Sequence, residues 1–188
     1  MQKLRRIFRK RAGAIAPKKL IFVDESGATT SMTRTHGRAP RGERVVDTVP
    51  LEHWTVMTML GAVRLAGPVA VMTVEAATDA EIFRQFVQAA LIPSLHRGDV
   101  VVWDNLGPHR AAGLESMLQA AGASLLPLPP YSPDFSPIEP GWSKVKEHLR
   151  TVKARTPEAL SKAAGEAFAT ITPDDAQGWF RHCGYAVH

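Results

Sequence analysis

Cysteine is nearly absent from this chain of 188 residues, and Cys183 is the single example. One cysteine excludes an internal disulfide and leaves no spacing for a zinc finger, which fits a reducing compartment. Long apolar runs are also missing, since none approaches the roughly 18 residues that a membrane span needs. The basic start MQKLRRIFRKRAG has no apolar stretch behind it, so we expect no secretory signal. These absences predict a cytoplasmic protein with no membrane segment.

Acidic residues are missing from the first 19 positions, which hold eight cations: Lys3, Arg5, Arg6, Arg9, Lys10, Arg11, Lys18 and Lys19. Removing these eight from the 23 basic residues of the chain leaves 15, against 18 acidic residues, so the positive excess belongs to this segment. Such a segment could neutralise nucleic-acid phosphates. It could equally be a solvated leader or linker, and both interpretations stay open.

Apolar patterning beyond residue 19 predicts an α/β fold. Strands are expected at residues 20–23, 45–49, 54–65, 69–74, 100–103 and 124–128. Helices are expected at residues 79–92 and around the apolar stripes within 114–121, 142–149 and 160–171. Three or four meandering strands followed by helix, strand, helix, strand and helix indicate a mixed five-stranded sheet flanked by helices, in a ribonuclease-H-like arrangement. We therefore divide the chain into a basic tail or linker, 1–19, and one folded domain, 20–188.

Two aspartates follow buried strands at equivalent places. Asp24 comes directly after residues 20–23, and Asp104 comes directly after residues 100–103. Functional groups tend to collect at the carboxyl ends of strands in open α/β sheets. Either aspartate alone could be an ordinary turn residue, but their repetition favours a site. Glu25 is left out, because neighbouring side chains of a strand point to opposite faces.

Glu139 is a third candidate because its structural alternative is awkward. Ser136-Pro137-Ile138-Glu139 matches a capping box, but Pro140 would then lack the amide hydrogen that the helix needs at that position. A helix beginning at Pro140 suits proline better, yet it leaves Glu139 at the cap, where glutamate is not favoured. This difficulty favours a functional role for Glu139 over a capping role.

Three carboxylates at one edge of a sheet would repel one another. Two charges about 4 Å apart cost on the order of 4 kcal/mol at an effective dielectric near 20. A divalent cation removes that cost, and a ligand set of oxygens favours Mg²⁺ or Mn²⁺ over zinc. Two such ions can activate a nucleophilic oxygen and stabilise the leaving oxygen of a phosphodiester. Asp24, Asp104 and Glu139 are thus the predicted catalytic and metal-binding residues, with two ions as cofactors.

Short motifs surround these acids: Phe22-Val23-Asp24-Glu25-Ser26-Gly27, Val102-Trp103-Asp104-Asn105 with His109, the proline-rich block 129–139 (PPYSPDFSPIE), 37–42 (GRAPRG) and 180–185 (FRHCGY). Residues 105–138, 34 in number, separate Asp104 from Glu139. Over about residues 18–187, these motifs and this spacing resemble bacterial insertion-sequence transposases of the mariner superfamily. The proline-rich block is highly specific.

The resemblance implies a ribonuclease-H-like DDE catalytic domain at 20–188 that cleaves DNA and transfers a strand into target DNA, with Asp24, Asp104 and Glu139 as its metal-binding triad. It implies DNA as the partner, a homodimer on that DNA, and association with the nucleoid in the cytoplasm. The candidate DNA contacts are Asn105, His109, Lys146, Arg5, Arg6, Arg9, Lys10 and Arg11. For His109, two other roles remain open: orienting the site or starting a helix. Trp142 is expected in the core.

The sequence departs from the family in two ways. Ser136 stands where the family commonly has asparagine, and no helix-turn-helix unit precedes the first strand. We therefore expect DNA recognition to come from a helix-turn-helix protein of an upstream reading frame, unless the chain is a truncated copy. Two alternatives are a nuclease on the same fold and an inactive remnant that binds DNA or dimerises. A phosphatase with Asp24 as nucleophile is disfavoured, because Ser26 stands where a second aspartate is needed.

Overall fold

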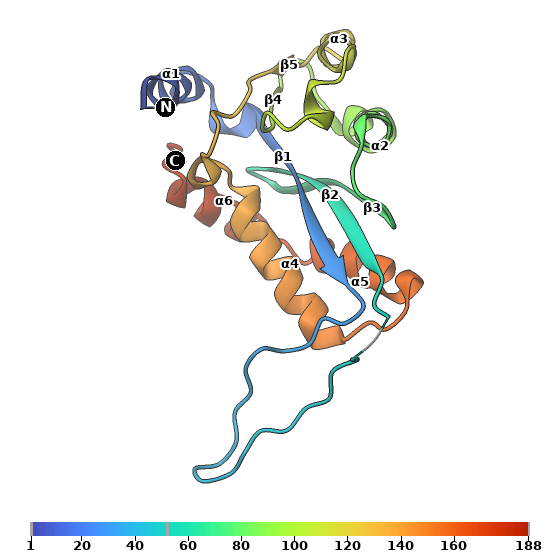
Figure 1. The fold of residues 1–188 in the computed structure, drawn as a ribbon. Coiled ribbons are helices and arrows are strands. Elements are labelled where there is room, and N and C mark those ends of the chain that lie inside the picture. Colours follow the sequence, from blue (N-terminus) through green and yellow to red (C-terminus); the bar gives the residue numbers. More distant parts are fainter. Residues whose placement is uncertain (1, 52, 188) are drawn as a thin grey trace.

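A mixed sheet of five strands forms the centre of the molecule (Figure 1). The computed structural model describes residues 2–51 and 53–187. The strands are β1 (Leu20–Thr29), β2 (Val56–Arg64), β3 (Gly67–Val74), β4 (Val100–Val102) and β5 (Ser124–Leu125). Their order in the sheet is β3-β2-β1-β4-β5; β1, β2 and β3 are antiparallel, whereas β4 is parallel to both β1 and β5. The predicted mixed five-stranded sheet is confirmed.

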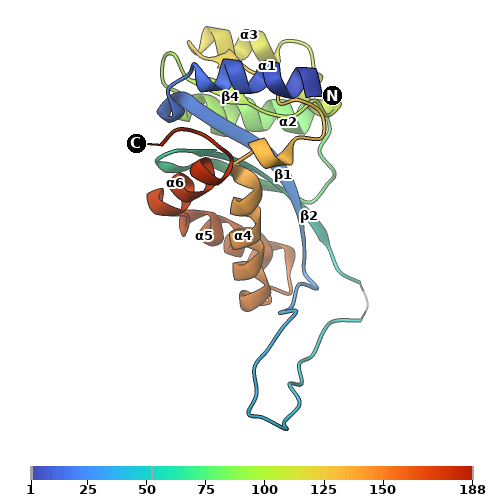
Figure 2. The same ribbon diagram turned by 90° about the vertical axis from the view of Figure 1, so that its left-hand side faces the viewer.

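Helices cover both faces of this sheet (Figures 1 and 2). The α-helices are α1 (Gln2–Gly13), α2 (Ala80–Phe86), α3 (Leu114–Ala120), α4 (Ile138–Val152), α5 (Pro157–Ala169) and α6 (Pro173–His182). Short 3₁₀ turns occur at Pro17–Lys19, Ile92–Ser94, Pro108–Arg110 and Pro133–Phe135, and a π-helical turn at Val87–Leu91 extends α2. One apolar core joins the sheet to α1, α4, α5 and α6, and a second joins it to α2 and α3. None of the helices within the described ranges is long and apolar enough to span a bilayer.

The first half of β1 is apolar at every position because it is covered on both faces. Leu20, Ile21, Phe22 and Val23 are all buried, with at most 2% of each exposed. Leu20 and Phe22 belong to the core beneath α4 to α6, whereas Ile21 and Val23 face α2 and α3. A strand buried on both faces has a continuous apolar run instead of an alternating one. This double burial places β1 in the middle of the sheet, where it can carry a site.

The strand predicted at residues 45–49 is wrong. Residues 30–51 and 53–55, between β1 and β2, contain no helix or strand and extend away from the body as a long arm (Figures 1 and 2). Val45, Val46 and Val49 are 46%, 82% and 54% exposed. β-branched residues favour strands when they pack on a half-buried pleated surface, and the arm offers none. The base of the arm is held by Arg155, which donates hydrogen bonds to the carbonyl oxygens of Thr30 and Met32 at 2.7 and 2.9 Å.

The segment expected as a tail or linker is instead the docked helix α1. Phe8 and Ala12 are buried on its inner face, 4% and 2% exposed. The Phe8 ring stacks on Phe135 with centroids 5.6 Å apart and an interplanar angle of 8°. Arg5 forms a bidentate ion pair with Asp134, in which Nη1 and Nη2 lie 2.8 and 2.5 Å from the two carboxylate oxygens. α1 therefore packs against the proline-rich block that precedes Glu139.

Candidate active site

Asp24 lies in the middle of β1, not at its end as expected. β1 continues to Thr29 because it stays paired with β2 over its whole second half. β4 is much shorter and pairs only with residues 20–22 of β1. Asp24 is thus the second residue beyond the point where β4 stops. Its side chain is half-buried, and its Oδ2 accepts a hydrogen bond from Nε1 of Trp142 at 3.0 Å.

Asp104 reaches the same place from the neighbouring strand. Phe22 is opposite Val102 in the parallel register, so two further residues bring Asp24 opposite Asp104. The chain turns away after Asp104, whose Oδ1 accepts a hydrogen bond from the Leu106 amide at 3.0 Å. The same oxygen lies 2.5 Å from Nδ1 of His109. This turn fixes the Asp104 carboxylate at the carboxyl end of β4.

Glu139 enters from α4, and the predicted helix start is wrong by a small shift. α4 begins at Ile138 with Pro137 as its cap, so Glu139 is its second residue and Pro140 its third. The first amides of a helix have no carbonyl partner within it, and the missing hydrogen of Pro140 therefore costs nothing. Helix α4 packs against β1, and Glu139 at its start lines the same cavity as Asp24 and Asp104.

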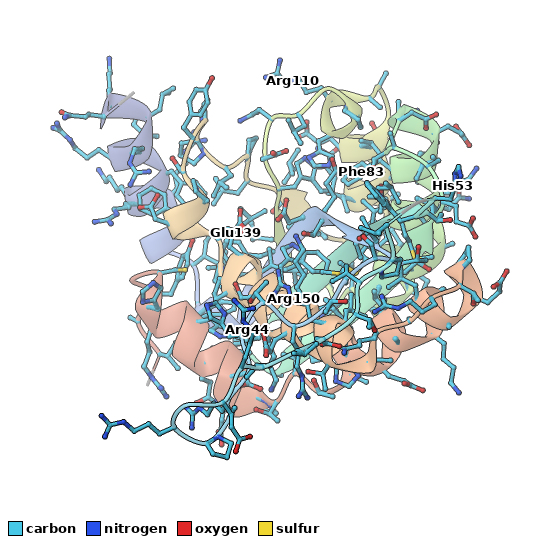
Figure 3. The ribbon with its side chains drawn as sticks, turned by 60° about the horizontal axis from the view of Figure 1, so that its bottom comes forward. Arg44, His53, Phe83, Arg110, Glu139 and Arg150 are labelled. Atoms are coloured by element: carbon cyan, nitrogen blue, oxygen red, sulfur yellow. The ribbon has the colours of Figure 1, made fainter. Side chains whose placement is uncertain are left out.

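The three acids line one cavity of about 400 Å³. Its walls come from β1, from the segment after β4 and from the proline-rich block. Arg110 and Tyr131 are also on its wall, and Figure 3 shows Arg110 on the segment after β4 and Glu139 at the start of α4. Tyr131 is 86% exposed and has a positive φ of 51°. The cavity is therefore acidic at its floor, with an arginine and an aromatic ring at its rim.

The carboxylates have different electrostatic environments. Burial, reinforced by the charge of Glu139, raises the pKa of Asp24 to about 7, although the Trp142 hydrogen bond opposes this. Burial is the largest single influence on Asp104 and acts to raise its pKa. The hydrogen bonds from His109 and the Leu106 amide, with the nearby charges of His109 and Arg110, together outweigh burial, so the pKa lies below its ordinary value. The pKa of Glu139 is raised by burial, against the opposing charge of Lys146. Asp24 is therefore the acid whose charged form is most disfavoured, first by burial and then by the charge of Glu139.

The three carboxylates suit a hard divalent cation only if water and substrate phosphates complete its coordination. No group of three or more His, Cys, Asp and Glu side chains in residues 2–51 and 53–187 is arranged to hold a metal ion by itself. Magnesium is usually held by one or two carboxylates together with waters and substrate phosphates, without a complete protein cage. Carboxylates that crowd one another around an open cavity fit that mode. Asp24, Asp104 and Glu139 are the side chains here that could hold such an ion.

Two of the residues expected to contact DNA are turned into the protein. His109 is buried, 3% exposed, with its ring 4.0 Å from that of Phe83, and it bonds to Asp104. Asn105 donates a hydrogen bond to the carbonyl oxygen of Leu128 at 2.6 Å. The position of His109 favours the orienting role over a phosphate contact. Asn105 connects the turn after β4 to Leu128, in the segment that follows β5.

The remaining cations that were expected to bind DNA lie on α4 and α1. Lys146 is half-buried, two helical turns beyond Glu139. Arg5 forms an ion pair with Asp134 and also donates a hydrogen bond to Ser132 Oγ at 2.8 Å. The exposed members of the set are Arg6, Arg9, Lys10 and Arg11. α1 therefore presents a basic surface beside the proline-rich block.

Sequence reasoning missed Trp142 and Arg110 as site residues. Trp142 was assigned to the core, where its ring does lie, but its indole N–H reaches Asp24. The available signal was its place three residues after Glu139, which puts both on one side of α4. For Arg110, the available signal was its position directly after His109, which makes it the lysine or arginine nearest in sequence to the motif around Asp104.

Comparisons with known proteins agree with this geometry. Residues 19–161 match the DDE superfamily endonuclease family. A Mos1 transposase paired-end complex with the left transposon end superposes with a TM-score of 0.68 at 14% identity, covering 96% of this chain and 56% of that chain. The Mos1 strand transfer complex gives 0.68 at 17% identity, with 94% and 55% covered. The Mos1 catalytic domain with raltegravir and Mg gives 0.66 at 16% identity, with 94% and 84% covered.

These likenesses confirm the ribonuclease-H-like fold. The chain spans slightly more than half the length of the transposase chains in the two complexes. A search by sequence among curated proteins gives no match.

Proposed function

The chain belongs to the DDE superfamily endonuclease family, and from that premise we propose that it is the catalytic domain of a DNA transposase. It would cleave a DNA strand and then transfer the resulting 3′ hydroxyl into target DNA. The observation that carries this proposal is the convergence of three acids on one cavity. Asp24, Asp104 and Glu139 come from β1, the end of β4 and the start of α4, which are far apart in the sequence.

Asp24, Asp104 and Glu139 are the proposed ligands of Mg²⁺ or Mn²⁺, and two ions would satisfy the chemistry. Bound divalent ions would polarise the attacking and leaving oxygens of a phosphodiester, with no need for a protein nucleophile. Solved relatives with Mg and with Mn support this choice of metal. His109 would keep Asp104 oriented, since metal-binding carboxylates are themselves held by hydrogen bonds.

DNA would reach the cavity along its basic rim. Arg110 on the cavity wall and Lys146, whose charge acts on Glu139, would contact the phosphates next to the cleaved bond. The exposed cations Arg6, Arg9, Lys10 and Arg11 of α1 would extend this contact by neutralising further phosphates, which makes binding salt-dependent. Arg5 would contribute indirectly, because its pair with Asp134 keeps α1 docked.

The working assembly would be a homodimer on DNA, associated with the nucleoid in the cytoplasm. One solved relative is a paired-end complex, which supports two ends being held together. The relatives' chains are longer than this one. A helix-turn-helix module, in a longer chain or from an upstream reading frame, would then supply recognition of the element ends.

Asp104→Asn tests the proposal, because the amide preserves the shape of the side chain and removes its charge. We expect the variant to fold but to lose metal-dependent nicking of plasmid DNA. The matched control is Asp174→Asn, which removes an exposed carboxylate from the first turn of α6 and should nick normally. Nicking by Asp104→Asn at the wild-type rate would refute the assignment.

A nuclease on the same fold is distinguished by the second step. With pre-nicked ends as substrate, a transposase joins the 3′ hydroxyl to target DNA, whereas a nuclease leaves it free. A remnant that only binds DNA would give neither product with any divalent metal.

A further inference from the structure

Trp142 links two of the candidate metal ligands. Its indole Nε1 donates a hydrogen bond of 3.0 Å to Oδ2 of Asp24 on β1. The same residue lies on α4, three positions after Glu139, and is 3% exposed. A bond between a buried ring and a half-buried carboxylate therefore ties the strand that carries Asp24 to the helix that carries Glu139.

The indole fits only because a glycine stands opposite Asp24. Gly61 of β2 is the register partner of Asp24. A Cβ atom at Gly61 would lie 2.7 Å from Cη2 of Trp142 and 2.9 Å from Cζ of Phe168. Both distances are too short for carbon contacts, so any larger residue would displace the rings. Phe168 closes the other side of this space, with its ring centroid 5.8 Å from that of Trp142.

We propose that Trp142 is a positioning residue that sets the orientation of Asp24 for metal binding, with Gly61 providing the space that the indole needs. An N–H donor fixes one carboxylate oxygen and so removes the rotation that an unbound carboxylate would retain. Groups that orient metal ligands in this way typically change metal affinity or activity by about 10- to 100-fold when they are removed.

This inference rests on the proposed function, because it takes Asp24 to be a metal ligand. It adds a separate claim, that a side chain with no contact to the metal determines how well the metal binds. The ring of Trp142 also packs in the apolar core, and a purely structural role there would affect stability and leave metal affinity unchanged. The two roles are therefore separated by measuring binding directly.

The experiment is Mn²⁺ titration by calorimetry on the full chain and its Trp142→Phe variant. Phenylalanine keeps a buried aromatic ring and removes the N–H group. We expect binding to weaken by about 10- to 100-fold while the circular dichroism spectrum stays unchanged. The matched control is Trp179→Phe, since Trp179 packs on the same helix at Gly141 and is not bonded to Asp24. This control should bind Mn²⁺ like the wild type.

Gly61→Ala provides a second approach that keeps the indole N–H. Displacement of the ring by the new Cβ should weaken Mn²⁺ binding in the same direction. Because both changes break one hydrogen bond, the double variant should bind little more weakly than the weaker of the two single variants. Additive losses would mean that Gly61 acts by another route and would overturn its part in the proposal.

A nuclear magnetic resonance measurement gives a readout without metal. The chain has four tryptophans, so the indole N–H resonances are easily resolved, and the missing one in Trp142→Phe identifies that residue. We expect this resonance to exchange slowly with water and to shift in Asp24→Asn. Unchanged Mn²⁺ affinity in Trp142→Phe, together with weakened affinity in Asp24→Ala, would overturn the inference alone. Unchanged affinity in Asp24→Ala would instead refute the proposed metal site.

Discussion

Asp24→Asn should stabilise the metal-free protein at alkaline pH and abolish its stabilisation by metal. The pKa of Asp24 is raised from 3.8 to about 7, first by burial and then by the charge of Glu139. Between these values, the folded protein binds a proton that the unfolded chain has released, so stability falls as pH rises. Asparagine stays neutral at every pH and still offers an oxygen to the Trp142 N–H group.

The size of the effect follows from the shift. A shift of about three pKa units corresponds to about 4 kcal/mol, since each unit is worth about 1.4 kcal/mol. This is the upper bound, reached above pH 7, and the advantage of asparagine shrinks to nothing near pH 4. For a chain of this length, 1 kcal/mol moves the melting temperature by about 2–4 °C. The variant should therefore melt up to about 8–16 °C above wild type at pH 8 in EDTA.

Thermal unfolding in EDTA and in Mn²⁺, at pH 4 and pH 8, provides the assay. Wild type should gain about 2.7 kcal/mol when Mn²⁺ is at 100 times its dissociation constant, whereas Asp24→Asn should gain nothing. Asp174→Asn, the exposed control, should change stability by less than about 1 kcal/mol at either pH. If Asp24→Asn melts no higher than wild type at pH 8, burial and the charge of Glu139 do not raise the pKa of Asp24 as described.

Three further predictions concern the fold. Phe22→Ala should cost about 3–5 kcal/mol in urea unfolding, because it empties the contact with Phe180 at 5.4 Å in the core; a loss below 1 kcal/mol would contradict this packing. Thr172→Ala removes the capping box of α6 and should lower the melting temperature by the equivalent of about 1 kcal/mol, whereas Thr172→Ser should retain most of it. The pKa of Asp175 is lowered to about 2, mainly by its hydrogen bond from Lys144. Its contribution to stability is present above pH 3.8 and is lost as pH falls toward 2; Lys144→Met should flatten that part of the acid titration.

The fold was predictable wherever apolar residues recur in the sequence at the spacing of a buried strand or helix face. The four apolar residues that begin β1 and the helical stripe of α4 gave the right elements, because their side chains decide which surface is covered. Val45, Val46 and Val49 misled, since strand propensity describes packing on a neighbour that the sequence does not show. The extension of β1 past Asp24 was hidden for the same reason, because polar residues remain in a strand when β2 pairs with them.

The candidate site was predictable in composition but not in its contacts. The acids could be chosen because Asp24 and Asp104 each follow a short apolar run, and Glu139 comes just before the helical stripe of Trp142, Val145 and Leu149. The bond from Trp142 to Asp24 joins residues 118 positions apart, and no local pattern carries that information. The helix was predicted to begin at Pro140, whereas α4 begins at Ile138. Pro140 is the third residue of α4, where its missing amide hydrogen costs nothing.

Helix α1 connects the surface that is proposed to bind DNA with the segment that leads into Glu139. Arg5 and Phe8 hold Asp134 and Phe135, only a few residues before Glu139. A DNA backbone bound to the outer cations of α1, as proposed, would therefore act on this segment. If DNA binding at α1 changed the affinity of the site for metal, metal binding would by thermodynamic reciprocity change the affinity of α1 for DNA by the same factor. DNA binding at α1 and metal binding at the acids would then be coupled equilibria, each affecting the other to the same extent.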